Sequence, residues 1–309
     1  MALSEYAGLV AAVFSPMNAD GSLHLQAVPT LVEQLIRTGV RGFYVCGTTG
    51  EGPLLSSQER CDVTQAYVTA AAGRIPVIVQ VGHDSLAEAR RLARHAREVG
   101  ADAIAAVPPV YFRPASVDIL VDCLSEISSA APDLPFLYYH IPRLTGVSVD
   151  VLDLLACASK RLPHFAGIKY SAPTIDEFQA CLRFQQGKYT MLFGCDEMLL
   201  SGLCAGAKGA VGSTYNFAAR LYIGIMEAFQ NNDMDRARQL QELSVQMVRV
   251  LHRYGGLPAI KATMGLLGLD CGPCRLPLQT LHADQVENLS QDLDRIGFFR
   301  WQQGEIQLL

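Results

Sequence analysis

The feature that most limits the fold of this chain is a repeated alternation of short apolar runs with longer segments of helical period. Eight runs of five or six residues are rich in Val, Ile, Ala and Tyr and lack strict polar alternation. Parallel strands that are covered on both faces have this character. The runs span residues 9–14, 42–46, 77–81, 103–107, 136–141, 165–169, 189–193 and 209–213.

The segments between these runs have the spacing of amphipathic helices. Residues 25–37 carry apolar side chains on one face, and residues 85–99 do the same, with four arginines placed toward the outside. We interpret this basic face as solvated surface. Ser57 opens the second helix, and Ser85 with Glu88 three residues later predicts a capping box.

Strand and helix alternate in units of about thirty residues, which favours an α/β fold of the (β/α)8 TIM barrel type. A doubly wound sheet is the main alternative. After Asn216 no further strand is evident, and residues 217–229, 234–251, 258–267 and 282–296 all have helical period. We therefore expect a single domain over 1–309, with the barrel over 8–232 and a C-terminal helical extension over 233–309.

Charge and composition exclude several classes of function. The net charge is −5 and the pI is about 5.8, so neither nucleic-acid nor membrane binding is indicated. The N-terminus lacks the pattern of a signal peptide, and no apolar run approaches the ~20 residues of a membrane span. Nine scattered cysteines, with no signal, indicate the cytoplasm. Cys271-Gly-Pro-Cys274 has no second ligand pair, so we interpret it as a loop and expect no metal.

Lys169 is unusual because it stands near the end of the buried run 165–169. Lysine is rarely buried without a partner. Partial desolvation lowers the pKa of an ammonium group, and the neutral amine is then a nucleophile toward a carbonyl. The alternative is a lysine whose head reaches solvent along the surface.

Polar residues gather at the ends of the other strands, where barrels hold their active sites. The turn Gly47-Thr-Thr-Gly-Glu51 can present N–H groups and two hydroxyls to an anion such as a carboxylate. Pro108-Pro-Val-Tyr111, Tyr138-Tyr-His-Ile-Pro142, Gly194-Cys-Asp-Glu197 and Gly212-Ser-Thr-Tyr-Asn216 follow four further strands. A tyrosine hydroxyl near a lysine can carry protons to and from a substrate.

These motifs, together with Gly167-Ile-Lys169, resemble those of the pyruvate-dependent class I aldolase and dihydrodipicolinate synthase superfamily from Gly8 to about Leu278. Within it the chain looks like the N-acetylneuraminate lyase family. The resemblance implies a (β/α)8 barrel with a helical extension, a homotetramer, and no metal or organic cofactor. It also implies a lyase that reversibly cleaves N-acetylneuraminate to N-acetylmannosamine and pyruvate through a lysine Schiff base.

The resemblance also implies roles for single residues. Lys169 would form the Schiff base with the substrate ketone, and Tyr139 would relay protons. Thr48 and Thr49 would hold the carboxylate of the pyruvyl end, with Thr48 also in the relay. Tyr111 would complete the relay from a neighbouring subunit. The polyol and N-acetyl end of the sugar acid would contact Ser171, Gly194, Asp196, Glu197 and Ser213.

Two alternatives stay open at this point. One is another pyruvate-dependent aldolase, synthase or dehydratase of the same superfamily. Dihydrodipicolinate synthases have an arginine two residues past the proline of Tyr-x-Ile/Val-Pro, where this chain has Leu144, and Arg143 stands one residue early. That offset disfavours the synthase, because a bidentate arginine site depends on position. The other alternative is a catalytically silent barrel that binds sugar acids.

Overall fold

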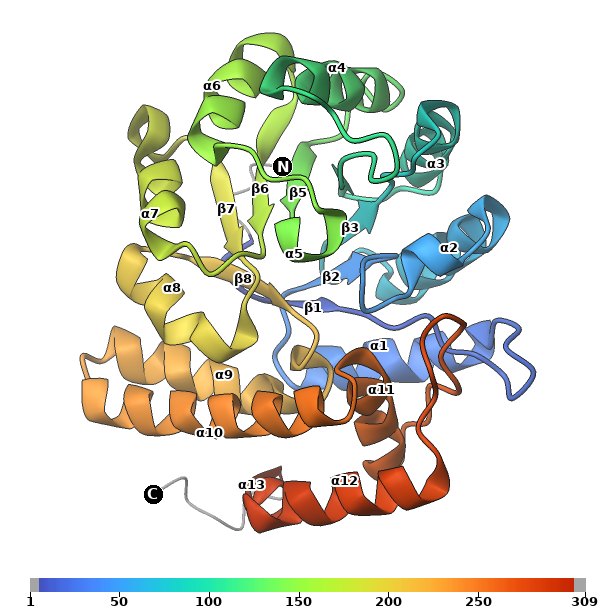
Figure 1. Cartoon of the computed structure of the whole chain (residues 1–309), viewed down its shortest axis with the longest axis vertical. Coiled ribbons are helices and arrows are strands. Elements are labelled where there is room, and N and C mark those ends of the chain that lie inside the picture. Colours follow the sequence, from blue (N-terminus) through green and yellow to red (C-terminus); the bar gives the residue numbers. More distant parts are fainter. Residues whose placement is uncertain (1–5, 303–309) are drawn as a thin grey trace.

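The eight predicted strands are present and close into a barrel (Figure 1). The computed structural model describes residues 6–302. Each strand pairs in parallel with its sequence neighbours, and β8 pairs with β1, so the sheet has no edge. This closure confirms the (β/α)8 barrel and excludes the doubly wound sheet. The strands are β1 Gly8–Ala12, β2 Gly42–Val45, β3 Val77–Gln80, β4 Ala103–Ala106, β5 Phe136–His140, β6 Phe165–Tyr170, β7 Thr190–Phe193 and β8 Gly209–Gly212.

Side chains along the strands alternate between the barrel interior and the surrounding helices. Tyr139 belongs to the apolar cluster inside the barrel, whereas Tyr138 belongs to the larger cluster outside it. Lys169 pairs with Tyr139 in the register of β5 and β6, and its neighbours Ile168 and Tyr170 lie in the outer cluster. Lys169 therefore points inward. Both faces of the sheet are buried, which explains the continuous apolar runs in the sequence.

Helices surround the barrel and begin close to their predicted positions. The expected helix over 25–37 is divided, because Pro29 fits only the first turn of an α-helix and so marks the start of α1. The main helices are α1 Val28–Arg37, α2 Ser57–Ala71, α3 Leu86–Glu98, α4 Val117–Ser128, α6 Val151–Arg161, α7 Ile175–Arg183, α8 Leu199–Ala205 and α9 Tyr215–Gln230. Short helical turns are η2 Leu25–Ala27, η3 Gly52–Leu54, α5 Pro142–Thr145, η4 Phe184–Gly187 and η5 Asp196–Met198.

The expected capping box at Ser85 is only half formed. Ser85 does accept the backbone N–H of Glu88, at 3.4 Å. The Glu88 carboxylate, however, turns to Arg91, and the backbone N–H of Ser85 donates to His83 Nδ1 at 2.9 Å. A complete capping box opens α2 instead, where the Ser56 hydroxyl and the Glu59 carboxylate satisfy each other's backbone N–H groups.

The C-terminal helices follow the barrel without a strand between them. They are α10 Met234–Arg253, α11 Leu257–Leu266, α12 Ala283–Arg295 and α13 Phe298–Gln302, of which only α13 was not predicted. In Figure 1 α10 lies along α9, and α12 and α13 lie on the side of α10 that faces away from the barrel. The division at residue 232 within one domain stays a prediction, and its outer ends, 1–5 and 303–309, fall outside the described residues.

Two further expectations concern the chain between these elements. Cys271 and Cys274 lie in the irregular connection between α11 and α12, as the loop interpretation predicted. In residues 6–302 no helix combines the length and the apolar character that crossing a membrane requires.

Candidate active site

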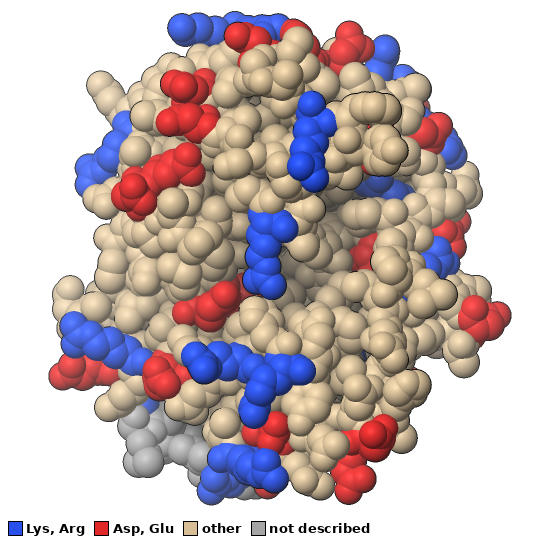
Figure 2. Space-filling model, viewed as in Figure 1, with Lys and Arg blue, Asp and Glu red and all other residues tan. Residues whose placement is uncertain are grey.

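A cavity of about 170 Å³ lies at the carboxyl ends of the strands. In Figure 2 the surface is hollowed near the middle of the face in view, with acidic and basic side chains around the hollow. Nine of the ten predicted site residues line this cavity. They are Thr48, Thr49, Tyr139, Lys169, Ser171, Gly194, Asp196, Glu197 and Ser213. The sequence motifs therefore converge on one place, as the barrel topology predicted.

Lys169 is buried at the floor of the cavity. Its side chain is 3% exposed, so the alternative of a head reaching bulk solvent is wrong. The amine lies over two tyrosine rings, 3.8 Å from the centre of Tyr44 and 3.9 Å from that of Tyr139. Burial lowers the pKa of Lys169 from its ordinary 10.5 to about 7, against the opposing effect of the Asp196 carboxylate. A large fraction of this amine is therefore neutral near pH 7.

Tyr139 connects the amine to the turn between β2 and α2. Its hydroxyl lies 3.3 Å from Thr48 Oγ1. Burial raises the pKa of Tyr139 to about 12, while hydrogen bonding with Thr48 and Ser171 lowers it. Tyr139 is thus protonated at neutral pH and is connected to a second hydroxyl. This arrangement can pass a proton between a bound molecule and Thr48.

The acidic side of the cavity is formed by the loop after β7. Asp196 Oδ2 accepts hydrogen bonds from the backbone N–H of Thr214 at 2.9 Å and from its hydroxyl at 2.6 Å. Burial raises the pKa of Asp196 to about 6, and the two Thr214 hydrogen bonds oppose that rise. Gly212 is required here, because a Cβ on it would lie 2.1 Å from Asp196 Oδ1.

One predicted site residue lies away from the cavity, and so do the two residues that were compared with the synthase arginine. Tyr111, the tenth site residue, is 81% exposed on the loop after β4, where its ring packs edge-to-face on Phe112. It does not line the cavity of its own chain. Arg143 and Leu144 are exposed on α5, and neither lines the cavity. This placement weakens the synthase alternative further.

Tyr44 and the C-terminal helices contribute to the site, and neither contribution was predicted from the sequence. Tyr44 of β2 belongs to the apolar cluster inside the barrel. Side chains along a strand point alternately to its two faces, and this alternation could have identified Tyr44 as an inward residue. Val248, Leu251 and His252 from α10 and Ile260 from α11 complete the cavity wall. Nothing in their spacing distinguishes them from ordinary residues of amphipathic helices. Thr214, which fixes Asp196, was seen only as part of a motif.

The fully buried Tyr44 hydroxyl leads to a prediction about stability. Within the part of the chain that the structure describes, this hydroxyl has no hydrogen-bond partner. Replacing Tyr44 by phenylalanine keeps the ring against Lys169 and removes the unpaired group, so we expect unfolding to cost about 1 kcal/mol more. Tyr67→Phe is the matched control, because the equally buried Tyr67 hydroxyl donates to Phe14 O at 2.7 Å. In urea denaturation, the free energy of unfolding should rise in Tyr44→Phe and fall in Tyr67→Phe. A Tyr44→Phe protein less stable than the parent would refute this account.

Comparisons with known proteins agree with the geometry. Residues 5–296 match the dihydrodipicolinate synthetase family. The chain is 39% identical to an N-acetylneuraminate lyase of Pongo abelii, over 97% of this chain and 96% of that one. It is 40% identical to N-acetylneuraminate lyase A of Xenopus laevis, over 94% and 97%. The solved structure of Proteus mirabilis N-acetylneuraminate lyase matches with a TM-score of 0.93 and 39% identity, over 95% of this chain and 99% of that one.

Proposed function

Because this chain belongs to the dihydrodipicolinate synthetase family, we propose that it is a class I aldolase that reversibly cleaves N-acetylneuraminate to N-acetylmannosamine and pyruvate. The observation that carries the proposal is the buried Lys169 amine, whose pKa is near 7, at a cavity lined by hydroxyls and carboxylates. The relatives that share nearly its whole length are lyases of this sugar acid by name. A silent barrel would have no use for a desolvated amine beside a tyrosine relay.

The reaction begins when the neutral amine of Lys169 attacks the C2 ketone of the open-chain sugar acid, and water leaves to give a protonated imine. The electron pair of the C3–C4 bond then moves toward the imine nitrogen, which produces the enamine of pyruvate. The C4 hydroxyl loses its proton to the oxygen of Tyr139 and becomes the aldehyde of N-acetylmannosamine. Tyr139 passes its own proton to Thr48, and Thr48 passes its hydroxyl proton to the carboxylate of the pyruvyl end, from which the relay returns it to C3 in the next step. Protonation at C3 and hydrolysis of the imine release pyruvate and restore the amine.

The remaining site residues would bind the two ends of the substrate. Thr48 and Thr49 would donate to the carboxylate next to the imine, since they line the cavity close to Lys169. Ser171, Gly194, Asp196, Glu197 and Ser213 would bind the hydroxyls and the N-acetyl group, which need both donors and acceptors. In residues 6–302 no three His, Cys, Asp or Glu side chains cluster as metal ligands would.

Assembly and compartment follow as parts of the same proposal. Tyr111 would complete the relay of a neighbouring subunit in a homotetramer, and its 81% exposure leaves the ring available for such a contact. The protein would act in the cytoplasm, where its nine cysteines would stay free thiols.

Borohydride trapping tests the proposed function directly. The protein is incubated with N-acetylneuraminate and borohydride, and its peptides are then analysed by mass. A pyruvyl-sized adduct on Lys169 would support imine chemistry and cleavage of this sugar acid together. An adduct with pyruvate but none with the sugar acid would favour another aldolase of the superfamily. The absence of both adducts would leave the silent barrel as the better account.

The lowered pKa of Lys169 predicts a specific pH dependence of imine formation. Only the neutral amine attacks, so the rate of inactivation by pyruvate and borohydride should rise with pH through about 7 and then level off. Asp196→Asn should move the midpoint to lower pH, because the Asp196 carboxylate favours the charged ammonium. A midpoint near 10, as for an exposed lysine, would contradict the desolvation argument.

A further inference from the structure

The turn that carries Thr48 and Thr49 is held by residues from the far end of the chain. Glu51, the last residue of the turn, is buried, and so is Lys261 of α11. Lys261 Nζ donates to Glu51 Oε1 at 2.8 Å and to Pro273 O at 2.6 Å. Glu51 Oε2 accepts the backbone N–H of Arg275 at 2.8 Å. Both carboxylate oxygens of Glu51 are therefore bound by the C-terminal extension.

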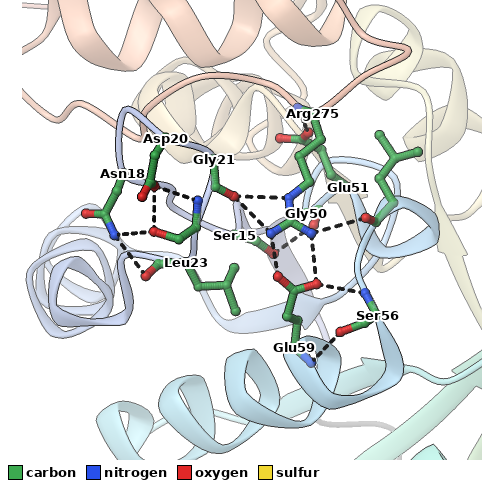
Figure 3. Close-up of polar contacts among 12 residues, drawn as sticks. Ser15, Asn18, Asp20, Gly21, Leu23, Gly50, Glu51, Ser56, Glu59 and Arg275 are labelled. Carbon is green, nitrogen blue, oxygen red and sulfur yellow. Dashed lines mark hydrogen bonds and ion pairs between the residues drawn. The ribbon is translucent and has the colours of Figure 1, made fainter.

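A second connection is made by the side chain of Arg275 (Figure 3). The Arg275 guanidinium forms a two-pronged ion pair with Glu59 of α2 and also donates to Gly21 O and Leu54 O. The hydrogen bonds from Arg275 are the main reason that the pKa of Glu59 falls to about 2. Glu59 in turn caps the first turn of α2, which follows the Thr48–Thr49 turn. Arg275 thus joins the loop at Gly21 to η3 and to the start of α2, the two segments that follow the turn.

The backbone of the turn needs such support. Cys46, which precedes the turn, and Glu51, its last residue, both have left-handed backbone conformations, with φ of 56° and 52°. Such conformations are unfavourable for residues other than glycine and persist only where surrounding contacts impose them. On the barrel side, Ser15 Oγ donates to Gly50 O at 2.7 Å, and the Tyr139 hydroxyl lies 3.3 Å from Thr48 Oγ1. The contacts on the opposite side come from Lys261 and the residues 273–275.

We propose that Glu51, Lys261 and Arg275 are positioning residues that hold Thr48 and Thr49 in the geometry that binds the carboxylate of a 2-keto acid. This inference rests on the proposed function. It makes the C-terminal extension a working part of the site: α11 supplies Ile260 to the cavity wall and Lys261, the next residue, to the turn. None of the three positioning residues needs to touch the substrate. Their effect falls on recognition of the carboxylate rather than on the chemistry of the amine.

The test compares a keto acid with a ketone that has no carboxylate. The double variant Glu51→Gln, Lys261→Met removes both buried charges together, so that neither is left unpaired. Borohydride inactivation is followed against pyruvate concentration and, separately, with acetone. We expect the half-saturating pyruvate concentration to rise about tenfold, with the maximal inactivation rate and the acetone rate unchanged. Leu289→Ala, a buried change in α12 away from the turn, is the control and should keep the pyruvate dependence of the parent protein even though it lowers the melting temperature.

Two results would overturn the inference. One is a folded double variant with the pyruvate dependence of the parent. The other is an equal fall in the rate of borohydride inactivation with pyruvate and with acetone, which would indicate a general structural role. If the double variant does not fold, Arg275→Met provides the same test, since the Arg275 side chain is 21% exposed and its loss leaves no buried charge. For Arg275→Met we expect the half-saturating pyruvate concentration to rise about threefold, and an unchanged concentration would overturn the inference. Failure of the parent protein to be trapped by pyruvate would instead refute the proposed function.

Discussion

Replacing Lys169 by methionine is expected to abolish cleavage of N-acetylneuraminate, with kcat/KM falling by about 10⁵-fold or more. Methionine has a similar length and fits the apolar surroundings, but it cannot form an imine. Product release is measured by coupling pyruvate to lactate dehydrogenase, with circular dichroism as the check on folding. A folded variant that kept a substantial lyase rate would exclude Lys169 as the Schiff-base residue.

The same substitution should make the protein more stable. The fall of the Lys169 pKa from 10.5 to about 7 means that the unfolded chain binds a proton that the folded chain does not between these pH values. Stability therefore increases with pH across that window, and at pH 7 the cost of burial is close to its full value, at most about 5 kcal/mol. The methionine variant should lose this pH dependence. Denaturation curves at pH 7 and pH 9 measure the difference directly.

Replacing Tyr139 by phenylalanine should lower kcat by about 10²- to 10⁴-fold with little change in substrate binding. The ring that contacts Lys169 is kept, while the hydroxyl that lies 3.3 Å from Thr48 Oγ1 is lost. Steady-state kinetics in both directions separate kcat from KM. Trapping of pyruvate on Lys169 should remain possible, since imine formation retains its nucleophile.

The adjacent tyrosine provides a matched control for that experiment. Tyr138 is as deeply buried as Tyr139, but it lies in the outer cluster, between the barrel and the helices. Tyr138→Phe should therefore leave kcat within about twofold of the parent value. An unchanged kcat in Tyr139→Phe, or an equal loss in both variants, would remove Tyr139 from the proton relay.

The barrel could be predicted from the sequence because the strands are buried on both faces and the runs are therefore apolar throughout. The hydrogen bonds of the helix caps could not be predicted in the same way. Ser85 and Glu88 have the spacing of a capping box, yet Arg91 and His83 compete for the two groups that would complete it. Such competition depends on side-chain directions that the spacing does not encode.

Some residues of the candidate site could likewise be predicted from the sequence, and others could not. Lys169, Tyr139 and the Thr48–Thr49 turn stand at strand ends, where the topology of a barrel brings distant motifs together. Tyr44 has no motif around it, and only the register of β2 places its ring under the amine. Lys261 is one lysine in a mostly apolar helix, and its partner Glu51 is 210 residues away. No local pattern can indicate a pairing at that separation.

That separation has a consequence for the way the molecule forms. During synthesis all eight strands leave the ribosome before Lys261 does, so a barrel can close while Glu51 still lacks its counter-charge. A buried carboxylate without a partner is unfavourable. The turn that carries Thr48 and Thr49 would therefore not take up its final conformation until α11 and residues 273–275 pack against it. The barrel can thus be assembled before it can bind a keto acid. From the proposed role of Glu51 and Lys261, we expect competence for catalysis to be one of the last properties that the folding protein acquires.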